Sequence, residues 1–332
     1  MKNKEMKNIS RRSFIKYSAA GAASLGCLNL FSCSGDSAHK SNVILIKTDD
    51  RTEGVRQAMQ LAHFKSPENK KVLIKPNFNT ADPTPGSTHN DTLEQIVTEI
   101  HKRGAKEITV GDRSGPQPTH EVLKEKGIHE MGSRLNFSII NFSELPDEDW
   151  LPFSPSGNHW ENGFTLARPV AESQYTVSTC CLKTHQYGGV FTMSLKNWVG
   201  VAPRNLMRQL HGSPHMRLMI AELNVPLSPE LIIIDGIEAF VDSGPMTGEK
   251  KKANIFIAGT DRVAIDAVGL AVLKYLGSND AIMETKIFEQ EQIARAVELG
   301  LGAKGPESIR LITGDKASAS YAREIEAILA QG

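Results

Sequence analysis

The run Leu231-Ile232-Ile233-Ile234, followed directly by Asp235-Gly236, is the stretch that decides the fold class. Four consecutive apolar residues without polar alternation are typical of a strand that is covered on both faces, as in the middle of a parallel sheet. A sheet of this kind needs a layer of helices on each face. The run therefore predicts an α/β protein with a mostly parallel open sheet and helices on both faces.

Short β-branched runs alternate with helical patterns on both sides of this strand. Residues 71–75 predict a strand, and residues 90–103, with apolar side chains at helical spacing and Gly104 behind them, predict a helix. Such alternation is typical of a parallel sheet built from strand–helix–strand units. Strands are expected at 43–46, 71–75, 107–111, 137–140, 175–182, 231–234, 254–258 and 309–312, and helices at 53–64, 90–103, 120–126, 216–224, 262–276, 286–299 and 321–330.

Residues 142–168 interrupt this alternation. They contain three prolines and two tryptophans and show little periodicity. We interpret them as an irregular insertion, with a hairpin around Gly157-Asn158 as a further hypothesis. Because no linker divides the chain after residue 43, we expect residues 43–332 to form a single α/β domain.

The first 32 residues have the composition of an export signal. Residues 10–16, Ser-Arg-Arg-Ser-Phe-Ile-Lys, resemble the twin-arginine signal pattern, and an apolar run from 17 to 31 follows. That run is shorter than the roughly 20 apolar residues of a transmembrane helix. We expect the twin-arginine translocase to recognise Arg11 and Arg12 and to export the folded protein; the alternative is a basic amphipathic helix of the mature fold.

The end of this segment resembles a lipoprotein cleavage box. Leu30-Phe31-Ser32-Cys33 predicts that Cys33 becomes the lipidated first residue, with Cys27 as a second candidate. The polar residues 33–42 would then be a tether. This predicts a lipid-anchored protein on the periplasmic side of a membrane; the alternative is cleavage and release into the periplasm.

Charge and cysteine content narrow the function classes. The six basic and one acidic residues of the signal leave 32 basic and 37 acidic residues in 33–332, a net charge of −5. A mildly acidic domain is a poor general binder of nucleic acid. Cys180-Cys181 can form a vicinal disulfide in an oxidising compartment; the alternative, which we favour, is two small buried side chains on a strand.

Polar side chains stand directly after five of the expected strands. The carboxyl ends of parallel strands lie along one edge of the sheet, where ligands bind. Any one of these residues can be a turn residue or a helix cap, Asp261 in particular because a helix follows it. Their recurrence predicts a shared site that holds Lys75 and Asn77, Asp112, Lys183, Thr184 and His185, Asp235, and Asp261.

Residues 194–200, Ser-Leu-Lys-Asn-Trp-Val-Gly, form a second polar cluster, preceded by Gly188-Gly189. Adjacent glycines let the backbone approach a ligand and present amides to an anion. Lys196 and Asn197 would act together with Lys75 and Lys183. The lysines therefore indicate a small anionic ligand, a carboxylate or a phosphate; the alternative is that they are ordinary solvated charges.

A divalent metal is a further hypothesis for this site. Its ligands would come from His185, His211, His215, Asp235 and Glu238. The Gly and Pro between His211 and His215 prevent helical alignment of the two rings. The sequence therefore identifies neither the metal nor its set of ligands.

Several of these segments together resemble the family called domain of unknown function 362. The resemblance runs from about Val43 to Thr313. It implies no particular reaction, because the family is defined without one. Many members carry a ferredoxin-like Cys-x-x-Cys-x-x-Cys segment, which this chain lacks, so no ferredoxin-type iron–sulfur cluster is expected. The matching segments are 72–77, 183–185, 194–200, 234–237, 244–248 and 259–266.

Two functions are compatible with these residues. The first is an enzyme acting on a small anionic substrate, in which lysines bind the anion, His185 is the acid or base, and Asp235 and Asp261 orient His185 or hold a metal. A redox reaction is a subsidiary hypothesis that rests only on the ferredoxin-bearing relatives. The second is a non-catalytic solute-binding or cell-envelope accessory protein that uses the same residues as hydrogen-bond partners.

Overall fold

The computed structural model describes residues 40–331, so the predictions for Arg11, Arg12 and Cys33 lie outside the described residues. Within this part, nine strands form one sheet in the order β11-β1-β10-β9-β7-β2-β3-β4, with β8 paired to β7. None of the helices in residues 40–331 is long and apolar enough to cross a membrane. The strands are β1 (Ser41–Lys47), β2 (Lys71–Lys75), β3 (Glu107–Asp112), β4 (Ser138–Asn141), β7 (Tyr175–His185), β8 (Val190–Thr192), β9 (Leu231–Ser243), β10 (Gly248–Gly259) and β11 (Ile309–Ile312).

Most neighbouring strands of this sheet run parallel. The pairs β9–β7, β7–β2, β2–β3, β3–β4 and β1–β11 are parallel, whereas β10 is antiparallel to both β9 and β1. The predicted class, a mostly parallel α/β sheet, is confirmed. The reversed strand β10 matters for the site, because its carboxyl end lies at the edge opposite to that of β2, β3, β7 and β9.

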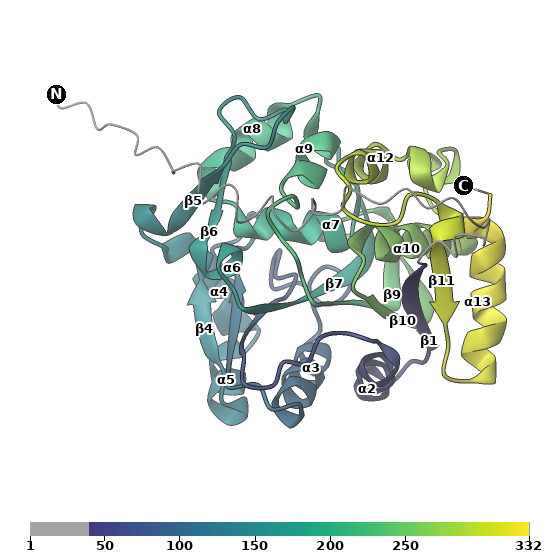
Figure 1. Cartoon of the computed structure of the whole chain (residues 1–332), viewed down its shortest axis with the longest axis horizontal. Helices are drawn as coiled ribbons and strands as arrows, with labels where there is room; N and C mark the ends of the chain where they lie inside the picture. Colours follow the sequence, from purple (N-terminus) through teal and green to yellow (C-terminus); the bar gives the residue numbers. More distant parts are fainter. Residues whose placement is uncertain (1–39, 332) are drawn as a thin grey trace, which may run out of the picture. The chain divides into compact units, whose positions relative to one another are not determined.

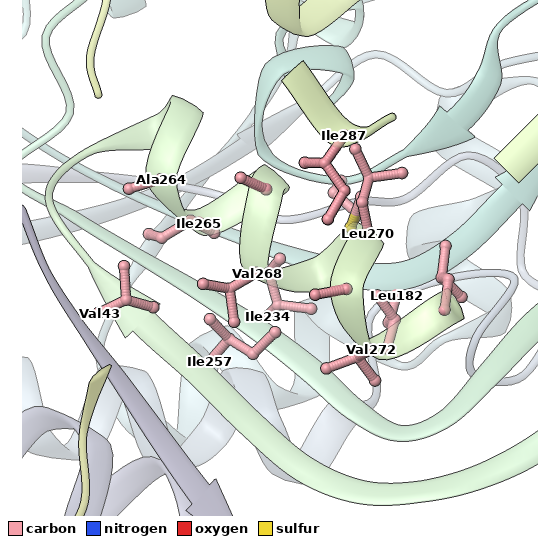
Figure 2. Packing of buried hydrophobic residues seen from close by; sticks show 14 of the residues in the cluster. Val43, Leu182, Ile234, Ile257, Ala264, Ile265, Val268, Leu270, Val272 and Ile287 are labelled. Atoms are coloured by element: carbon pink, nitrogen blue, oxygen red, sulfur yellow. The ribbon is translucent and has the colours of Figure 1, made fainter. Parts of the chain in front are cut away.

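The run at 231–234 forms the start of β9 and is covered on both faces, as its composition predicts. Ile232 and Ile234 pack into one apolar layer, and Leu231 and Ile233 into the other. This alternation follows from the two-residue period of a strand. Figure 2 shows Ile234 beside side chains of the helix that covers the first layer. Both layers are therefore closed by helices.

Helices cover the two faces of the sheet (Figure 1). α2 (Arg51–Leu61) and α3 (Asn90–Lys102) close one face, and α10 (Arg262–Leu276) and α13 (Lys316–Leu329) close the other. α10 is apolar around its whole circumference because it lies between the sheet and outer elements. The other helices are α4 (Thr119–Glu125), α5 (Ile128–Leu135), α6 (Arg168–Ala171), α7 (Ser194–Asn197), α8 (Met207–Gly212), α9 (Met216–Glu222), α11 (Asp280–Met283) and α12 (Glu291–Glu298).

The segment 142–168 is more regular than its composition predicts. β5 (Trp150–Phe153) and β6 (Phe164–Ala167) form a separate two-stranded antiparallel sheet, with Gly157 in the connection between them. Trp160 is buried in a third apolar cluster together with α9. The insertion thus contains a hairpin around Gly157-Asn158, as the further hypothesis predicts.

Two strands extend well past their expected ends. β7 continues to His185, and β9 continues to Ser243 instead of ending at Ile234. Cys180 and Cys181 lie within β7 as buried free thiols, and burial raises the pKa of Cys181 to about 11. The pair thus has the structural character of two small buried side chains. Asp235, by contrast, is moved from a strand end to the interior of a strand.

Candidate functional site

A cavity of about 740 Å³ opens at the carboxyl ends of β2, β3 and β7. Lys75 is the last residue of β2, Asp112 of β3 and His185 of β7, and all three line it. The cavity is also bounded by α7, by α8 and by the loop that contains Pro245. Its volume is within the range of small-molecule sites. The parallel half of the sheet thus places its strand-end residues around one space.

Lys75 and Asp112 form a buried ion pair at the floor of this cavity. Lys75 Nζ lies 2.7 Å from Asp112 Oδ1, and both side chains are almost fully buried. Asp112 also accepts hydrogen bonds from the backbone amides of Phe78 and Arg113, each at 2.7 Å. A Cβ at Gly200 would lie 2.6 Å from Asp112 Oδ1 and 2.9 Å from Lys75 Nζ, so only glycine lets the backbone cross the pair.

Lys183 holds two loops of the cavity together. Its ammonium group donates to Asn77 Oδ1 at 2.8 Å, to Gly86 O at 2.6 Å and to Pro245 O at 3.2 Å. These three acceptors use all three of its N–H donors. Burial lowers the pKa of Lys183 to about 8, and no carboxylate is among its three acceptors. All hydrogen-bond donors of the Lys183 ammonium are therefore used, while its positive charge still faces the cavity.

Asn197 fixes α7 against the sheet. Its Nδ2 group donates to Ser178 Oγ at 3.0 Å and to Lys75 O at 3.3 Å. The carboxylate of Asp266, on α10, accepts from the amides of Ser194 and Leu195 at the start of α7, at 2.7 and 2.9 Å. This short helix is thus held at both ends, and the residue between them, Lys196, is positioned by a rigid support.

Among the buried basic side chains of the wall, Lys196 and His185 stand out because neither Lys196 Nζ nor His185 Nδ1 has a hydrogen-bond partner within residues 40–331; the uncharged groups Asn79 Nδ2 and Thr192 Oγ1 of the wall are likewise buried without one. Lys196 is 8% exposed and His185 7% exposed, and both line the cavity. Within residues 40–331 neither an acceptor nor a carboxylate contacts the Lys196 ammonium, and His185 Nδ1 is buried without a hydrogen bond. A Cβ at Gly189 would lie 2.7 Å from Lys196 Cε and 3.0 Å from His185 Nδ1, so the two side chains meet over this glycine.

The electrostatics of this pair follow from burial among cations. Burial, together with the nearby charges of Lys183 and Arg113, lowers the pKa of Lys196 to about 7. Burial and the adjacent Lys196 hold the pKa of His185 far below its ordinary value. At neutral pH the imidazole is therefore uncharged, and a large fraction of Lys196 is an uncharged amine.

Two arginines add to the positive charge. Arg113 is buried and donates to three backbone carbonyls, of Ala202 at 2.7 Å, Val199 at 2.8 Å and Ser114 at 3.0 Å. Arg204 is exposed at the rim. The lining thus contains five basic side chains, Lys75, Arg113, Lys183, Lys196 and Arg204, against one carboxylate, Asp112.

Asp235 lies away from this cavity. It sits inside β9, and its carboxylate accepts from Arg51 Nε at 2.8 Å and from Thr92 Oγ1 at 2.7 Å, on the face covered by α2 and α3. A strand end at Ile234 would have placed Asp235 at the rim of the cavity. The strand instead continues for nine residues beyond Ile234, to Ser243. The structure thus separates Asp235 from His185, which it was predicted to orient.

Asp261 lies at the opposite edge of the sheet. β10 is antiparallel to β9, so its end at Gly259 pairs with Ile232 near the start of β9. The Asp261 carboxylate caps α10, accepting from Val263 N at 2.9 Å and Ala264 N at 3.0 Å, and it also accepts from Ser41 Oγ and Ala303 N. The structure therefore places it as the helix cap that the sequence offered as an alternative.

Thr184 also points away from the cavity. It lies on β7 between Lys183 and His185, so strand alternation directs it to the other face, where Oγ1 donates to Phe240 O at 3.4 Å. Of the ten predicted catalytic and ligand-binding residues, seven line the cavity: Lys75, Asn77, Asp112, Lys183, His185, Lys196 and Asn197. The three others, Thr184, Asp235 and Asp261, do not.

The proposed metal ligands are dispersed. Residues 40–331 contain no group of three or more His, Cys, Asp and Glu side chains that could hold a metal ion. His211 lines the cavity, whereas the ring of His215 packs 4.7 Å from that of His159, and Glu238 lies near Lys250. The described residues therefore give the metal hypothesis no set of ligands.

Sequence reasoning missed several residues of the cavity wall. Tyr187 and Thr192 belong to the β7–β8 hairpin, and Met246 to the loop between β9 and β10. Gly188, with φ of +80°, was a turn signal that pointed to this hairpin. No residue pattern indicated that the hairpin and the distant loop close over one space.

The family model described as domain of unknown function (DUF362) matches residues 72–271. This range includes all seven of the predicted site residues that line the cavity. The chain belongs to this family. The DUF362 match also runs from β2 into α10 and so includes the elements that build the cavity. The resemblance found in the sequence is thereby confirmed.

Three individual proteins that this chain resembles share at most 25% of their residues with it over the matched regions. A thylakoid-associated protein of Synechocystis sp. (strain ATCC 27184 / PCC 6803 / Kazusa) is 25% identical over 222 residues, which are 64% of this chain and 66% of that protein, just under two thirds of its length. The lactate racemase apoprotein of Thermoanaerobacterium thermosaccharolyticum superposes with a TM-score of 0.44 at 14% identity, over 89% of this chain and 88% of that one. A protein of Thermotoga maritima gives a TM-score of 0.37 at 15% identity, over 55% of this chain and 49% of that one.

Proposed function

We propose that this DUF362 protein is an enzyme that binds a small anionic substrate, a carboxylate or a phosphate, in the cavity and moves a proton within it. The observation that supports this most is the adjacent pair His185 and Lys196, both buried, both without partners and both facing a cationic space. Buried polar groups are normally hydrogen-bonded, and the exceptions concentrate at sites that act on a ligand.

The binding half of the proposal rests on charge. Lys75 and Asp112 neutralise each other, which leaves Arg113, Lys183, Lys196 and Arg204 without a carboxylate partner in the wall. An anion in this space would compensate them in a region of low dielectric, where charge–charge attraction is stronger than in water. It would also raise the pKa of Lys196, so binding would take up a proton.

The catalytic half rests on the uncharged imidazole. A neutral His185 beside a bound anion can accept a proton from the substrate, and the anion would raise the low pKa of the ring toward a useful value. Lys196, next to it over Gly189, is placed to stabilise negative charge that develops on the substrate. Asp235 and Asp261 have no part in this arrangement.

The test is hydrogen–deuterium exchange into a panel of small carboxylates and phosphate esters, followed by proton NMR in D₂O with the full chain. We expect one class of compound to exchange at a carbon beside its carbonyl or carboxyl group, and His185→Gln to reduce that rate at least about a hundredfold. His129→Gln, at an exposed site outside the cavity, serves as the control. Binding without exchange of any compound would contradict catalysis and favour the solute-binding alternative.

We also propose that the twin-arginine translocase exports the protein and that Cys33 anchors it to the periplasmic side of a membrane. The support is the order of the Arg11-Arg12 pair, the apolar run and the cysteine in the sequence. Labelling of cells with a radioactive fatty acid tests this. We expect the label in the wild-type chain and its loss in Cys33→Ser; label retained by Cys33→Ser would contradict the assignment.

A further inference from the structure

The three buried lysines of the cavity are not equivalent. Lys75 is paired with Asp112, and Lys183 gives its three N–H donors to three oxygen atoms. Lys196 alone among them lines the cavity without an acceptor within residues 40–331. Its Nζ opens onto the cavity, but the side chain is largely desolvated among other cations, and both effects of that environment favour the uncharged amine.

We propose that Lys196 is a nucleophile that forms an imine with a carbonyl compound carrying a carboxylate or phosphate group. The proposal rests on the anionic substrate proposed above and narrows it to 2-oxo acids and to phosphorylated aldehydes or ketones. An uncharged primary amine adds to carbonyl carbon, and lysines desolvated among other cations are the ones that react in this way.

The support of α7 gives the amine a fixed position. Asp266 caps the start of the helix, and Asn197, directly after Lys196, is bonded to β2 and β7. Gly189 leaves the space in which Lys196 Cε and His185 Nδ1 lie side by side. A nucleophile held on a rigid element loses less entropy when it reacts.

The chemical step balances with the groups present. The amine nitrogen of Lys196 attacks the carbonyl carbon, and the C=O electron pair moves to oxygen. Before the attack, the Lys196 ammonium gives one proton to the neutral ring of His185. After the attack, a second proton passes from nitrogen to the carbonyl oxygen to give a carbinolamine. The ring then returns its proton to the hydroxyl, which leaves as water, and the product is a protonated C=N bond to Lys196. The positive charge of this C=N bond replaces that of the Lys196 ammonium. The anionic group of the substrate compensates this charge and also the charges of Lys183, Arg113 and Arg204.

Reductive trapping tests the proposal. The full chain is incubated with pyruvate, or with dihydroxyacetone phosphate, and sodium cyanoborohydride, and the modified residue is located by peptide mass spectrometry. We expect one covalent adduct, on Lys196, formed at least about tenfold faster than on the exposed Lys286 near neutral pH, where exposed lysines are almost fully protonated. The rate should rise as pH increases above about 7, the pKa of Lys196 in the chain without ligand, because a smaller fraction of the amine is then protonated.

Two variants make the test decisive. Lys196→Arg keeps the positive charge and removes the nucleophile, and we expect it to bind inorganic phosphate but to form no adduct. Lys286→Arg should label as the wild type does, and circular dichroism checks that both variants are folded. A chain that binds phosphate but labels on Lys183, or labels equally in Lys196→Arg, overturns the imine and leaves anion binding intact. A chain that binds neither phosphate nor pyruvate overturns the proposed function itself.

Discussion

The cavity at the ends of β2, β3 and β7 and the polar cluster around Asp235 both place charged groups in the interior, but they differ in how those groups are satisfied. Asp235 receives hydrogen bonds from Arg51 and Thr92 on adjacent helices. Lys196 Nζ finds no acceptor among the described residues, and His185 Nδ1 makes no hydrogen bond with them. The first arrangement joins α2 and α3 to the sheet, whereas the second leaves bonding capacity for a ligand.

This difference separates stability from function. Removing a group whose partners are saturated leaves those partners unpaired, which costs free energy of unfolding. Removing a buried group that has no partner costs nothing in hydrogen bonds and relieves desolvation. Removal of Asp235 and removal of Lys196 should therefore change stability in opposite directions, and only variants in the cavity should change ligand binding.

The largest effect is expected at Asp235. Asp235→Ala leaves Arg51 and Thr92 without their acceptor, and we expect a loss of about 3 kcal/mol in the free energy of unfolding, measured in urea. The exposed Asp147→Ala should change it by less than about 0.5 kcal/mol. Phosphate affinity should be the same in both. A stable Asp235→Ala chain that no longer binds phosphate would reverse the assignment of the two regions.

The two cavity lysines provide the sharpest contrast. Lys183→Met leaves three oxygen acceptors unpaired and should destabilise the protein by about 2 kcal/mol. Lys196→Met removes a desolvated cation and should stabilise it by about 2 kcal/mol. Urea unfolding in phosphate-free buffer measures both. Equal losses in the two variants would show that Lys196 is as saturated as Lys183.

The gain in Lys196→Met should depend on pH. Folding lowers the pKa of Lys196 from 10.5 to about 7, so its stability contribution is present above the unfolded value and is lost as pH falls through the folded one. The advantage of the variant over the wild type should therefore be largest below about pH 7 and disappear toward about pH 10. Unfolding series at several pH values measure it; a constant difference would contradict the assigned pKa.

A smaller effect is expected at Asp261. Asp261→Ala removes the cap of α10 and should cost about 1–2 kcal/mol of stability. Because β10 ends at the opposite edge of the sheet, phosphate affinity should not change. Thermal unfolding and phosphate titration of the same sample measure the two quantities. A loss of affinity larger than the loss of stability would return Asp261 to the site.

The smallest change in stability is expected at Gly189. A Cβ there would press on Lys196 Cε and His185 Nδ1, both in side chains that can shift. Gly189→Ala should cost less than about 1 kcal/mol but weaken phosphate binding severalfold. Gly212→Ala, where no atom lies within 4 Å of the added Cβ, is the matched control. Unaltered binding in Gly189→Ala would mean that the Lys196–His185 contact does not matter.

The strand-end rule brought residues of parallel strands together and misplaced Asp261, which follows the antiparallel strand β10. Lys75 and Asp112 end parallel strands and Lys183 lies two residues before the end of β7, so the strand-end rule brought them together. Asp261 obeys the same pattern in sequence, but the direction of β10 depends on its long hairpin with β9. Residue composition does not indicate the direction of a strand.

The other failures concern strand length and face. Asp235 follows four apolar residues, yet the strand continues because the residues beyond it, such as Ala239 and Phe240, are also buried. Thr184 has the right position along β7 and the wrong face, since a strand with every residue buried shows no alternation to read. The sequence also could not show that Lys196 is the lysine without a partner, because its surroundings come from loops that are far apart in the chain.

Titration of inorganic phosphate into the full chain by isothermal calorimetry tests the central claim most directly, with Lys196→Gln in the cavity and Lys286→Gln on the surface as matched variants. We predict binding of one phosphate per chain, with proton uptake, in the wild type and in Lys286→Gln. In Lys196→Gln we predict a loss of at least about 1.4 kcal/mol, a tenfold change in affinity. Equal affinity in all three chains would contradict the claim that Lys196 is held without a partner for an anionic ligand.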